Sequence, residues 1–492
     1  MIEQHLPALQ VVLPLLLAPL CVLLHRGFLA WLVALLTSWA TFAIACLLLE
    51  QAMTQGAISY AMGGWAPPWG IEYRVDVLSG FMLVMVTLIG SLVMTYARRS
   101  VVQEIDADRV YLFYTAYLLN LAGLLGVVIT GDIFNLFVFI EISSLSSYAL
   151  ISLGHDRRAL LAAFRYLILG TLGATFILIG IGYLYAVTGT LNMVDLAARL
   201  PEVMHTRTAK TALGFLTIGL ALKTAVFPLH LWLPNAYSFA PSVVSTFLAG
   251  TTTKVYLYVL LRIMYSVFGV QFVFNTMHLH AILLPLALAS AILGSLVAIY
   301  QFDLKRMLAY SSIGQIGYMV IAISMASVTG VQAGILHMFN HAVIKTALFL
   351  AIGCVIFSHG RATLDTIAGA GRTMPWTMAA FVIAGLSIIG VPLTAGFVSK
   401  WYLVLAAVEQ GHWVTTGLIV LASLLAAIYI WRVVEAAYFR EPAGDTVRQE
   451  APLSMLVPLW VLALMNIYLG IDTRFTVPFA AEAAQSLMRV SS

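Results

Sequence analysis

Charged residues are scarce in this sequence, and their scarcity decides the class of protein. Asp, Glu, Lys and Arg make up only 9% of the 492 residues, whereas 62% are hydrophobic. A soluble domain usually carries roughly a quarter charged residues, so the chain lacks the side chains that would cover a water-soluble surface. The hydrophobic residues occur in runs of about 18 to 25, long enough to cross a bilayer as helices. Strand-like alternation is also absent, which excludes a porin-like barrel, and we predict an all-α polytopic membrane protein.

Cysteine is equally rare, and the cysteines present are poorly placed for chemistry. Cys21, Cys46 and Cys354 lie far apart within apolar runs, where we interpret them as small core residues. They form no CxxC pair, iron–sulfur spacing or disulfide framework. The sequence also lacks a dinucleotide-binding fingerprint and a Walker loop. Its formal charge of +4 is too small and scattered for a nucleic-acid-binding protein, so we expect no cofactor, no redox centre and no nucleic acid partner.

The apolar runs define about 14 membrane spans. Because no cleavable secretory signal is evident, the first run is interpreted as a retained span. Of the Lys and Arg residues in loops or towards the ends of spans, seven lie on the side of both termini and fourteen on the opposite side. Since basic loops face the cytoplasm, we expect a bacterial cytoplasmic (inner) membrane protein with both termini extracytoplasmic. The spans are predicted at about 7–24, 28–49, 75–97, 110–130, 132–153, 160–187, 210–232, 242–268, 279–300, 303–325, 330–357, 376–407, 413–435 and 452–470.

Four lysines inside predicted spans are the most informative feature of the sequence: Lys223, Lys254, Lys345 and Lys400. A lysine at mid-bilayer costs about 2.5–3.5 kcal/mol on insertion scales, so such residues are usually buried, partnered and part of an ion or proton path. Glu141 is the only acid that lies equally deep. It is either a structural partner of one lysine or a carboxylate that exchanges protons with it. The two roles overlap, because a pair that shares protons also anchors its helices.

The segment HMFNHAVIK carries three more titratable positions, which we call the histidine–lysine ladder. His337, His341 and Lys345 recur at intervals of four, which places them along one helix face about 6 Å apart. A single histidine on an apolar helix is more often a satisfied core residue, but three titratable groups in one stripe are hard to explain by packing. Two histidines at this spacing can bind zinc, yet no third ligand of the metal-binding kind accompanies them. We favour a proton relay over a metal site, because histidine titrates near neutrality.

Two predicted spans carry helix-breaking residues next to a lysine. The seventh span has Pro228 and Pro234 just after Lys223. The twelfth has Pro392, between two glycines, just before Lys400. Proline removes a backbone donor and kinks or breaks a helix, and unwound backbone within a membrane is tolerated only where it is buried in protein or lines a cavity. Paired interruptions in two halves of a chain indicate a transporter with inverted repeats, whereas kinks that only improve packing would not predict a lysine beside each.

Two loops have a less defined role. The segment that begins at Gln301 places Asp303, Lys305 and Arg306 at the cytoplasmic start of the tenth span. A charged helix end and a part in conduction explain these residues equally well. The glycine- and proline-rich stretch at 63–68 is expected to form a rigid extracytoplasmic loop without chemistry.

Five motifs in order resemble one family of membrane proteins. The motifs are FVFIE at 137–141, ALKTAxxPLHxWLPxA at 221–236, APSVVSxxLAG at 240–250, DLKRxLAYSSIGQxGY at 303–318 and HMxNHAxxK at 337–345. They are similar to the antiporter-like subunits shared by respiratory NADH:quinone oxidoreductase, membrane-bound hydrogenases and Mrp-type cation/proton antiporters. The resemblance covers about residues 60–435, and so many motifs in one order make it highly specific.

The resemblance implies an organisation as well as a fold. It predicts 14 helices with two inverted five-helix repeats, which would set Lys223 and Lys400 at equivalent positions. The chain then divides into N-terminal helices at 1–109, a first repeat at 110–268 and a second repeat at 279–435, followed by a loop and last helix at 436–492.

The same resemblance suggests a role for each buried residue. Glu141 and Lys223 are similar to the paired carboxylate and lysine of one half-channel, and Lys254 to the residue that links it onward. The histidine–lysine ladder resembles the connecting relay, and Lys400 the residue at the second half-channel. One departure is Arg165, where the family usually has lysine; arginine keeps the charge but does not release a proton.

Within the family, details of the sequence favour the D-type protein of Mrp antiporters. Lysine at Lys400 argues against the M-type respiratory subunit, which has glutamate there. The chain ends soon after the last span, without the lateral helix of the L-type subunit or the extra domains of the A-type Mrp protein. The motif GGWAPPWGI at 63–71, together with the length, is also similar to the D-type Mrp protein.

The sequence therefore predicts an ion-translocating subunit of a multisubunit monovalent cation (Na+)/proton antiporter, with other hydrophobic subunits as partners. Protons would pass from Glu141 and Lys223 through Lys254 and the ladder to Lys400. The main alternative is a proton-pumping subunit of a redox complex, either a membrane-bound hydrogenase or NADH:quinone oxidoreductase. A stand-alone transporter for an organic solute is a further alternative, but it would need a substrate cavity with directed polar groups. Under each hypothesis the chain is a transport protein rather than an enzyme with its own redox centre.

Overall fold

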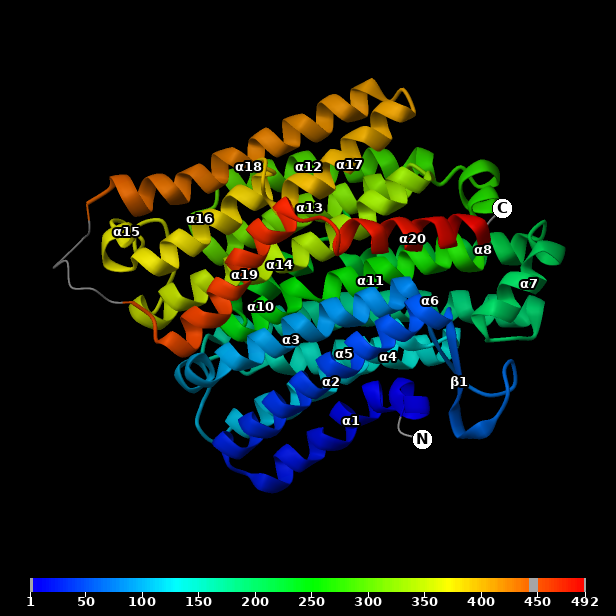
Figure 1. The fold of residues 1–492 in the computed structure, drawn as a ribbon, viewed down its shortest axis with the longest axis horizontal. Coiled ribbons are helices and arrows are strands. Elements are labelled where there is room, and N and C mark those ends of the chain that lie inside the picture. The colour runs from blue at the N-terminus through cyan, green and yellow to red at the C-terminus, as the bar shows by residue number, and fades with distance from the viewer. Residues whose placement is uncertain (1–2, 442–449, 491–492) are drawn as a thin grey trace.

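Long apolar runs become helices in this protein because lipid offers no partner for backbone N–H and C=O groups, so each span must satisfy its own. The computed structural model describes residues 3–441 and 450–490 and is almost entirely helical over them (Figure 1). Within these ranges, twelve helices are long and apolar enough to cross a membrane. Two further crossings are each divided into two shorter helices, which accounts for the 14 spans that the sequence predicts.

The N-terminal half of the chain holds six long helices followed by shorter ones. Their bounds are α1 Leu6–Leu24, α2 Gly27–Gln55, α3 Val77–Glu104, α4 Val110–Ile129, α5 Ile133–Ser152, α6 Arg157–Thr188, α7 Met193–Val203, α8 Arg207–Thr224, α9 Trp232–Phe239, α10 Ser242–Gly250 and α11 Thr252–Leu261. Two single π-helical turns follow, η3 Arg262–Val267 and η4 Gln271–Thr276.

The C-terminal half repeats the alternation of long and divided helices. Its elements are α12 His280–Ile299, α13 Leu304–Ser324, α14 Val328–His359, α15 Ala370–Thr373, α16 Pro375–Ile389, α17 Ala395–Glu409, α18 Trp413–Phe439, α19 Leu453–Ile471 and α20 Thr476–Val490.

Several short elements were not predicted from the sequence. The strands β1 Ile58–Ala61 and β2 Glu72–Val75 pair in antiparallel register, so the loop expected at 63–68 is the tip of a β hairpin. Two 3₁₀ turns accompany them, η1 Glu3–His5 and η2 Met62–Gly64. The helices α7 and α20 are amphipathic and too short to span a bilayer. Each has a polar face, so neither forms the continuous apolar run that predicts a membrane span.

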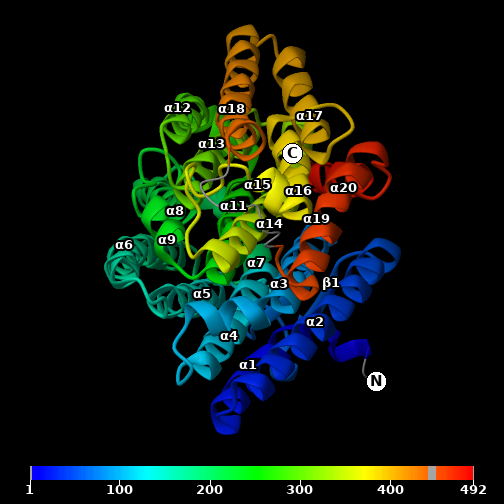
Figure 2. The same cartoon turned by 90° about the vertical axis from the view of Figure 1, so that its left-hand side faces the viewer.

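The helix α14 lies at the centre of the bundle. It packs against α3, α10, α13, α16, α17, α19 and α20. It is buried almost throughout, whereas α18 exposes most of its apolar surface at the edge. Figure 2 shows α1 and α2 at one flank of the molecule and α17 and α18 at the opposite flank. A polar side chain on α14 therefore has protein on every side, which is the environment that its histidines and lysine require.

The start of α1 and the end of α20 lie at the same end of the bundle as α7 and the β hairpin (Figure 1). This agrees with an even number of crossings. Of the basic residues counted on the opposite face, Arg448 lies outside the described residues, as does part of the predicted C-terminal segment 436–492.

Candidate functional site

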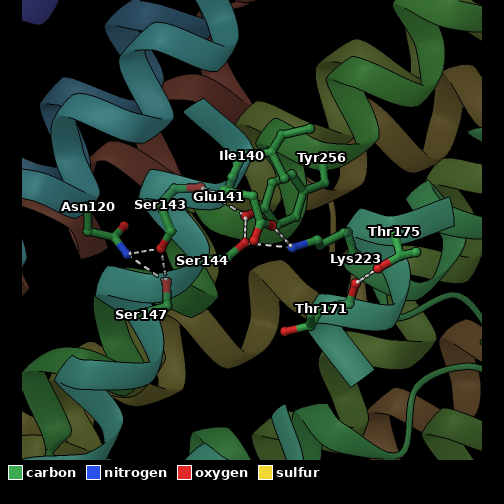
Figure 3. A network of polar contacts seen from close by, with 10 residues as sticks. All are labelled: Asn120, Ile140, Glu141, Ser143, Ser144, Ser147, Thr171, Thr175, Lys223 and Tyr256. Carbon is green, nitrogen blue, oxygen red and sulfur yellow. Dashed lines mark hydrogen bonds and ion pairs between the residues drawn. The ribbon is translucent and has the colours of Figure 1, made fainter. Parts of the chain in front are cut away.

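Glu141 and Lys223 form an ion pair between α5 and α8. The ammonium Nζ of Lys223 donates to Glu141 Oε1 at 3.1 Å and to Ser144 Oγ at 2.7 Å (Figure 3). The lysine side chain is fully buried, and 24% of the glutamate side chain is exposed. A carboxylate and a hydroxyl together replace the water that the ammonium lost, which offsets the cost of burying it.

The break that follows Lys223 explains how the lysine is held. The helix α8 ends at Thr224, and Ala225 adopts a left-handed conformation with φ 58°. The N–H groups of Ala225 and Val226 close the end of α8 on the carbonyls of Leu222 and Ala221. Pro228 lies in the connection that follows and has no N–H with which to continue the helix. The indole of Trp232, at the start of α9, donates to the carbonyl of Leu222 at 2.9 Å. Trp232 therefore ties the two halves of the divided helix together beside the lysine.

Pro234 has a different place from the one expected. It lies within the first turn of α9 rather than in the interruption, a position where proline is tolerated because the first N–H groups of a helix have no intrahelical partner. The seventh crossing accordingly extends to Phe239, beyond the predicted end of the span at about residue 232.

A network of hydroxyl groups extends from the ion pair towards α4 and α11, and the sequence analysis missed it. Tyr256 Oη lies 3.0 Å from Ser143 Oγ and 3.1 Å from Ser144 Oγ. Asn120 donates to Ser147 Oγ at 2.6 Å, as Figure 3 shows. The run ISSLSS directly after the glutamate was the available signal, since serines are unusual in such number on a buried helix.

Lys254 lies where another helix is interrupted. The helix α10 ends at Gly250 and α11 begins at Thr252, which puts Lys254 in the first turn of α11. Its Nζ donates to the carbonyl of Ala249, near the end of α10. The fully buried ammonium is thus stabilised by a carbonyl that the interruption leaves available.

The histidines of the ladder face the same interior, but their surroundings differ. Their rings are 5.8 Å apart and almost parallel. His337 has both nitrogens engaged, Nδ1 with Ser399 Oγ at 2.9 Å and Nε2 with Gln315 Oε1 at 3.0 Å. Neither nitrogen of His341 has a hydrogen-bond partner among the described residues, although its side chain is fully buried. His337 is therefore fixed in orientation, whereas the ring of His341 has its donor and its acceptor available.

Lys345 completes the ladder against α13. Its Nζ donates to the carbonyl of Leu308 at 2.7 Å and to Ser311 Oγ at 3.0 Å. Both partners are neutral, so within the described part of the chain the buried ammonium has dipoles but no counter-ion in direct contact.

Lys400 is held by the second divided helix. The helix α16 ends at Ile389, Pro392 lies in the interruption, and α17 begins at Ala395. Lys400 Nζ donates to the carbonyls of Ile388 and Ile389 at 2.8 and 2.9 Å and to the hydroxyl of a serine on α18, Ser423, at 2.8 Å. Carbonyls freed by the break therefore stabilise this lysine, as one does for Lys254.

An aromatic ring connects Lys400 to the ladder. The ammonium of Lys400 lies 4.9 Å from the centre of the Tyr318 ring, within the range of a cation–π contact. The same tyrosine also contacts His337, whose ring centre lies 5.7 Å from that of Tyr318, with the two rings nearly perpendicular. Tyr318 belongs to the DLKRxLAYSSIGQxGY motif, but nothing in that motif identified its role.

The contacts thus divide the candidate residues into two groups. One is the Glu141–Lys223 pair with its hydroxyl network, and the other joins Lys400 to the stacked histidines. Lys254, whose Nζ donates to the Ala249 carbonyl, belongs to neither group by a direct polar contact within the described residues. Within residues 3–441 and 450–490, no hydrogen bond or ion pair joins Lys223 directly to Lys254. The row consists of ionisable side chains spaced by hydroxyls, carbonyls and aromatic rings.

Comparisons with known proteins relate the whole chain to one family of membrane proteins. Residues 130–426 match the family described as NADH:quinone oxidoreductase/Mrp antiporter, TM. The chain is 43% identical over 488 residues to the N-type subunit of NADH-quinone oxidoreductase from Desulforudis audaxviator, covering 95% of this chain and 96% of the relative. It is 29% identical over 428 residues to the D-type protein of the Na(+)/H(+) antiporter from Alkalihalophilus pseudofirmus, covering 87% and 85%.

Two solved structures have the same fold. A chain of the membrane-bound sulfane sulfur reductase, an archaeal respiratory membrane complex, superposes with a TM-score of 0.91 at 31% identity, covering 99% of this chain and 98% of that one. A chain of the Mrp complex from Dietzia sp. DQ12-45-1b gives a TM-score of 0.90 at 25% identity, with the same coverage.

Proposed function

We propose that this chain, which belongs to the NADH:quinone oxidoreductase/Mrp antiporter family, carries protons through the membrane along its row of buried lysines and histidines. It is an antiporter-like membrane subunit of the kind found in Mrp antiporters and in respiratory complexes. The observation that carries the proposal is the 3.1 Å pair between Glu141 and Lys223 inside the bundle. A lysine that can pass its proton to a neighbour needs a carboxylate whose charge changes with it.

Conduction proceeds by alternation of charge along the row. When Lys223 is charged, Glu141 and Ser144 stabilise it; when Glu141 gains a proton, that stabilisation weakens and the lysine releases its own proton. The proton then moves through Lys254 and the ladder towards Lys400. No covalent bond other than N–H and O–H is made or broken in any step.

The two divided helices support a repeated architecture. In the first half α4 packs on α5, α5 on α6, and α6 on α8; in the second half α12 packs on α13, α13 on α14, and α14 on α16 and α17. We take residues 110–268 and 279–435 as the two inverted repeats, preceded by 1–109 and followed by 436–492. Each repeat contributes one lysine beside a break, Lys223 and Lys400.

The physiological role we propose is that of a subunit in a Na+/proton antiporter. The similarity to the D-type antiporter protein over most of both chains and the fold shared with the Mrp complex support it. Its partners would be the other hydrophobic subunits of that complex. The basic-rich face would lie in the cytoplasm of a bacterial cell, with both termini outside, according to the distribution of Lys and Arg.

A second candidate role is that of a proton-pumping subunit in a redox complex. The 43% identity to a protein named as the N-type subunit of NADH-quinone oxidoreductase favours it, as does the fold shared with a respiratory sulfane sulfur reductase. The proton row is the same under both roles, so the partner subunits would supply either the cation path or the redox centre.

The experiment is a pH-gradient assay in inverted membrane vesicles that contain the whole gene cluster. A respiratory substrate builds the gradient, and Na+, K+ or Li+ is then added. Collapse of the gradient on addition of a cation, in the wild type but not in Glu141→Gln, supports antiport through the row. Pumping that follows a dehydrogenase or hydrogenase substrate, without a cation response, supports the redox role. Glu435→Gln is the matched control, because Glu435 pairs with Arg440 on the exposed end of α18.

Retention of activity in Glu141→Asp is the second part of the test. A shorter carboxylate still exchanges protons, so some transport should remain, whereas the amide of glutamine cannot take a proton at all. Equal transport in Glu141→Gln and wild type would contradict the proposed function under either role.

A further inference from the structure

A charged cavity opens at the end of the bundle opposite the β hairpin. Its volume is about 470 Å³, and acidic and basic side chains from both halves of the chain line it, among them Glu104, Asp156, Asp303, Lys305 and Arg306. This is the face on which the basic residues outnumber those of the other face two to one. The sequence did not distinguish a structural from a conducting role for Asp303, Lys305 and Arg306. In the structure these residues line the wall of the cavity.

Two opposite charges hold the turn that closes this cavity. The turn joins α9 to α10, and α10 begins after Pro241, which has no side-chain oxygen to cap the helix. Glu104 supplies the cap from α3: its Oε2 accepts from the N–H of Ser242 at 2.9 Å and from Ser242 Oγ at 3.0 Å. From the other side Lys305, on α13, donates to the carbonyl of Ala240.

Lys305 is the deepest titratable group of the cavity. Only 6% of its surface is exposed, and its hydrogen-bond acceptor among the described residues is a neutral carbonyl. The carboxylates of Glu104, Asp303 and Asp156 act on it electrostatically from a distance. The nearby carboxylates balance the charge of Lys305 without an ion pair to its ammonium among the described residues, so the proton on Nζ remains exchangeable.

The helix α13 leads from this cavity to the ladder. Lys345 donates to Leu308 and Ser311, which follow Lys305 by three and six residues on the same helix. At the α-helical rise these positions are about 4.5 and 9 Å further along the axis. The cavity, Lys305, Ser311 and Lys345 thus follow one another from the surface to the centre of the bundle.

We propose that this cavity is a proton inlet that feeds the row at Lys345, with Lys305 as the group that transfers the proton inward. The inference rests on the proposed function, but adds a point of access at the middle of the row, apart from the Glu141–Lys223 pair. In the transfer step, Nζ of Lys305 releases a proton to water beside α13, and the proton reaches neutral Lys345 through the Ser311 hydroxyl that contacts it. Lys305 then recovers a proton from water in the cavity, so that one proton enters for each one passed on.

A labelling experiment tests access through the cavity. Ser238 lies on the cavity wall and is replaced by cysteine in a Cys46→Ala background, since Cys21 and Cys354 are already buried. A membrane-impermeant, positively charged thiol reagent is added from the basic-rich face of the whole complex in vesicles. Transport is compared before and after labelling in the same preparation.

We expect labelled Ser238→Cys to transport at least about tenfold more slowly, because a fixed cation near the path repels an arriving proton. A neutral reagent of similar size should slow it less. Ser152→Cys, on the same face but outside the cavity lining, is the matched control and should be insensitive to both reagents. Complete labelling of Ser238→Cys, measured by mass spectrometry, with an unchanged rate would overturn the inlet.

The variant Lys305→Arg distinguishes a lysine that transfers protons from one that only stabilises the turn between α9 and α10. Arginine can still donate to the Ala240 carbonyl, but it does not release its proton at any physiological pH. We expect the variant to assemble and to lose most transport, whereas a purely structural lysine would tolerate arginine with full activity. Glu141→Gln distinguishes the two proposals: if it is inactive while Lys305→Arg and labelled Ser238→Cys are fully active, the inlet fails and the proposed function stands. If Glu141→Gln is fully active, the proposed function itself fails.

Discussion

The contact between α6 and α8 leads to a quantitative prediction about the position of Lys223. Gly219 lies one helical turn before the lysine, and a Cβ atom there would stand 2.7 Å from the carbonyl oxygen of Gly173 and 2.7 Å from a side-chain carbon of Ile177. Ordinary contact begins near 3.4 Å, so Gly219→Ala must separate the two helices by about 0.7 Å (3.4 − 2.7). Overpacking of this kind costs about 1–3 kcal/mol.

The same displacement reaches the ion pair. A shift of about 0.7 Å would lengthen the 3.1 Å contact between Lys223 and Glu141 to as much as about 3.8 Å, beyond hydrogen-bonding distance. Misplacement on this scale is expected to lower transport between about tenfold and 100-fold. The glycine is thus required by close helix packing, as is common for small residues between membrane helices.

Gly214 on the same helix provides the control. No described atom lies within 4 Å of a Cβ atom at that position, so Gly214→Ala gains the helix propensity of alanine, about 1 kcal/mol, without a clash. Thermal unfolding in detergent and vesicle transport are measured for both variants. We expect Gly219→Ala to be about 1–3 kcal/mol less stable than Gly214→Ala; equal stability and equal transport would refute the packing argument.

Three further predictions concern single contacts. Trp232→Phe keeps an aromatic ring but removes the shorter of two hydrogen bonds to the carbonyl of Leu222, which then keeps only the N–H of Ala225 at 3.3 Å, and should lower stability by about 0.5–1.5 kcal/mol together with transport. Arg262→Gln leaves Asp76, its ion-pair partner between η3 and the start of α3, without a counter-charge and should cost about 3 kcal/mol in chemical unfolding. His341→Leu removes no hydrogen bond to the described residues, so stability should change by less than about 1 kcal/mol while proton transport in vesicles is lost.

Each of these three variants has a matched control. For Trp232→Phe the control is Trp413→Phe, which changes an exposed indole at the start of α18 and should leave stability and transport unchanged. Arg440→Gln breaks an exposed pair and should cost less than about 1 kcal/mol. His337→Leu loses two hydrogen bonds and should be less stable than His341→Leu; the reverse order would contradict the assignment of their surroundings.

The sequence was sufficient for the fold class and for the depth of the charged residues. A lysine in an apolar run can only be buried or at a span end, so Lys223, Lys254 and Lys345 were identified without coordinates. The number of crossings followed from the lengths of the runs, including the two divided ones. The β hairpin and the amphipathic helix α20 were missed, because neither contains an apolar run of membrane length.

The hydrogen-bond partners of the buried side chains on other helices could not be predicted from the sequence. That His337 lies between Ser399 and Gln315 depends on the rotation of three helices, α14, α17 and α13. Apolar patterning fixes rotation poorly when a helix such as α14 is buried on all sides. The misplacement of Pro234 has a similar origin. Proline is compatible both with a break and with the first turn of a helix, and only the backbone distinguishes the two.

The excess of lysine over carboxylate along the row has a consequence for selectivity. Of the four buried lysines in the row, only Lys223 contacts a carboxylate among the described residues, so the interior carries a positive potential whenever most of them are protonated. At an effective dielectric of about 20, a sodium ion about 4 Å from a single ammonium is repelled by about 4 kcal/mol. A proton that is handed from one nitrogen to the next never travels as a free ion and avoids this barrier. If the chain conducts protons as proposed, the row would therefore act as an electrostatic filter that passes protons and repels metal cations.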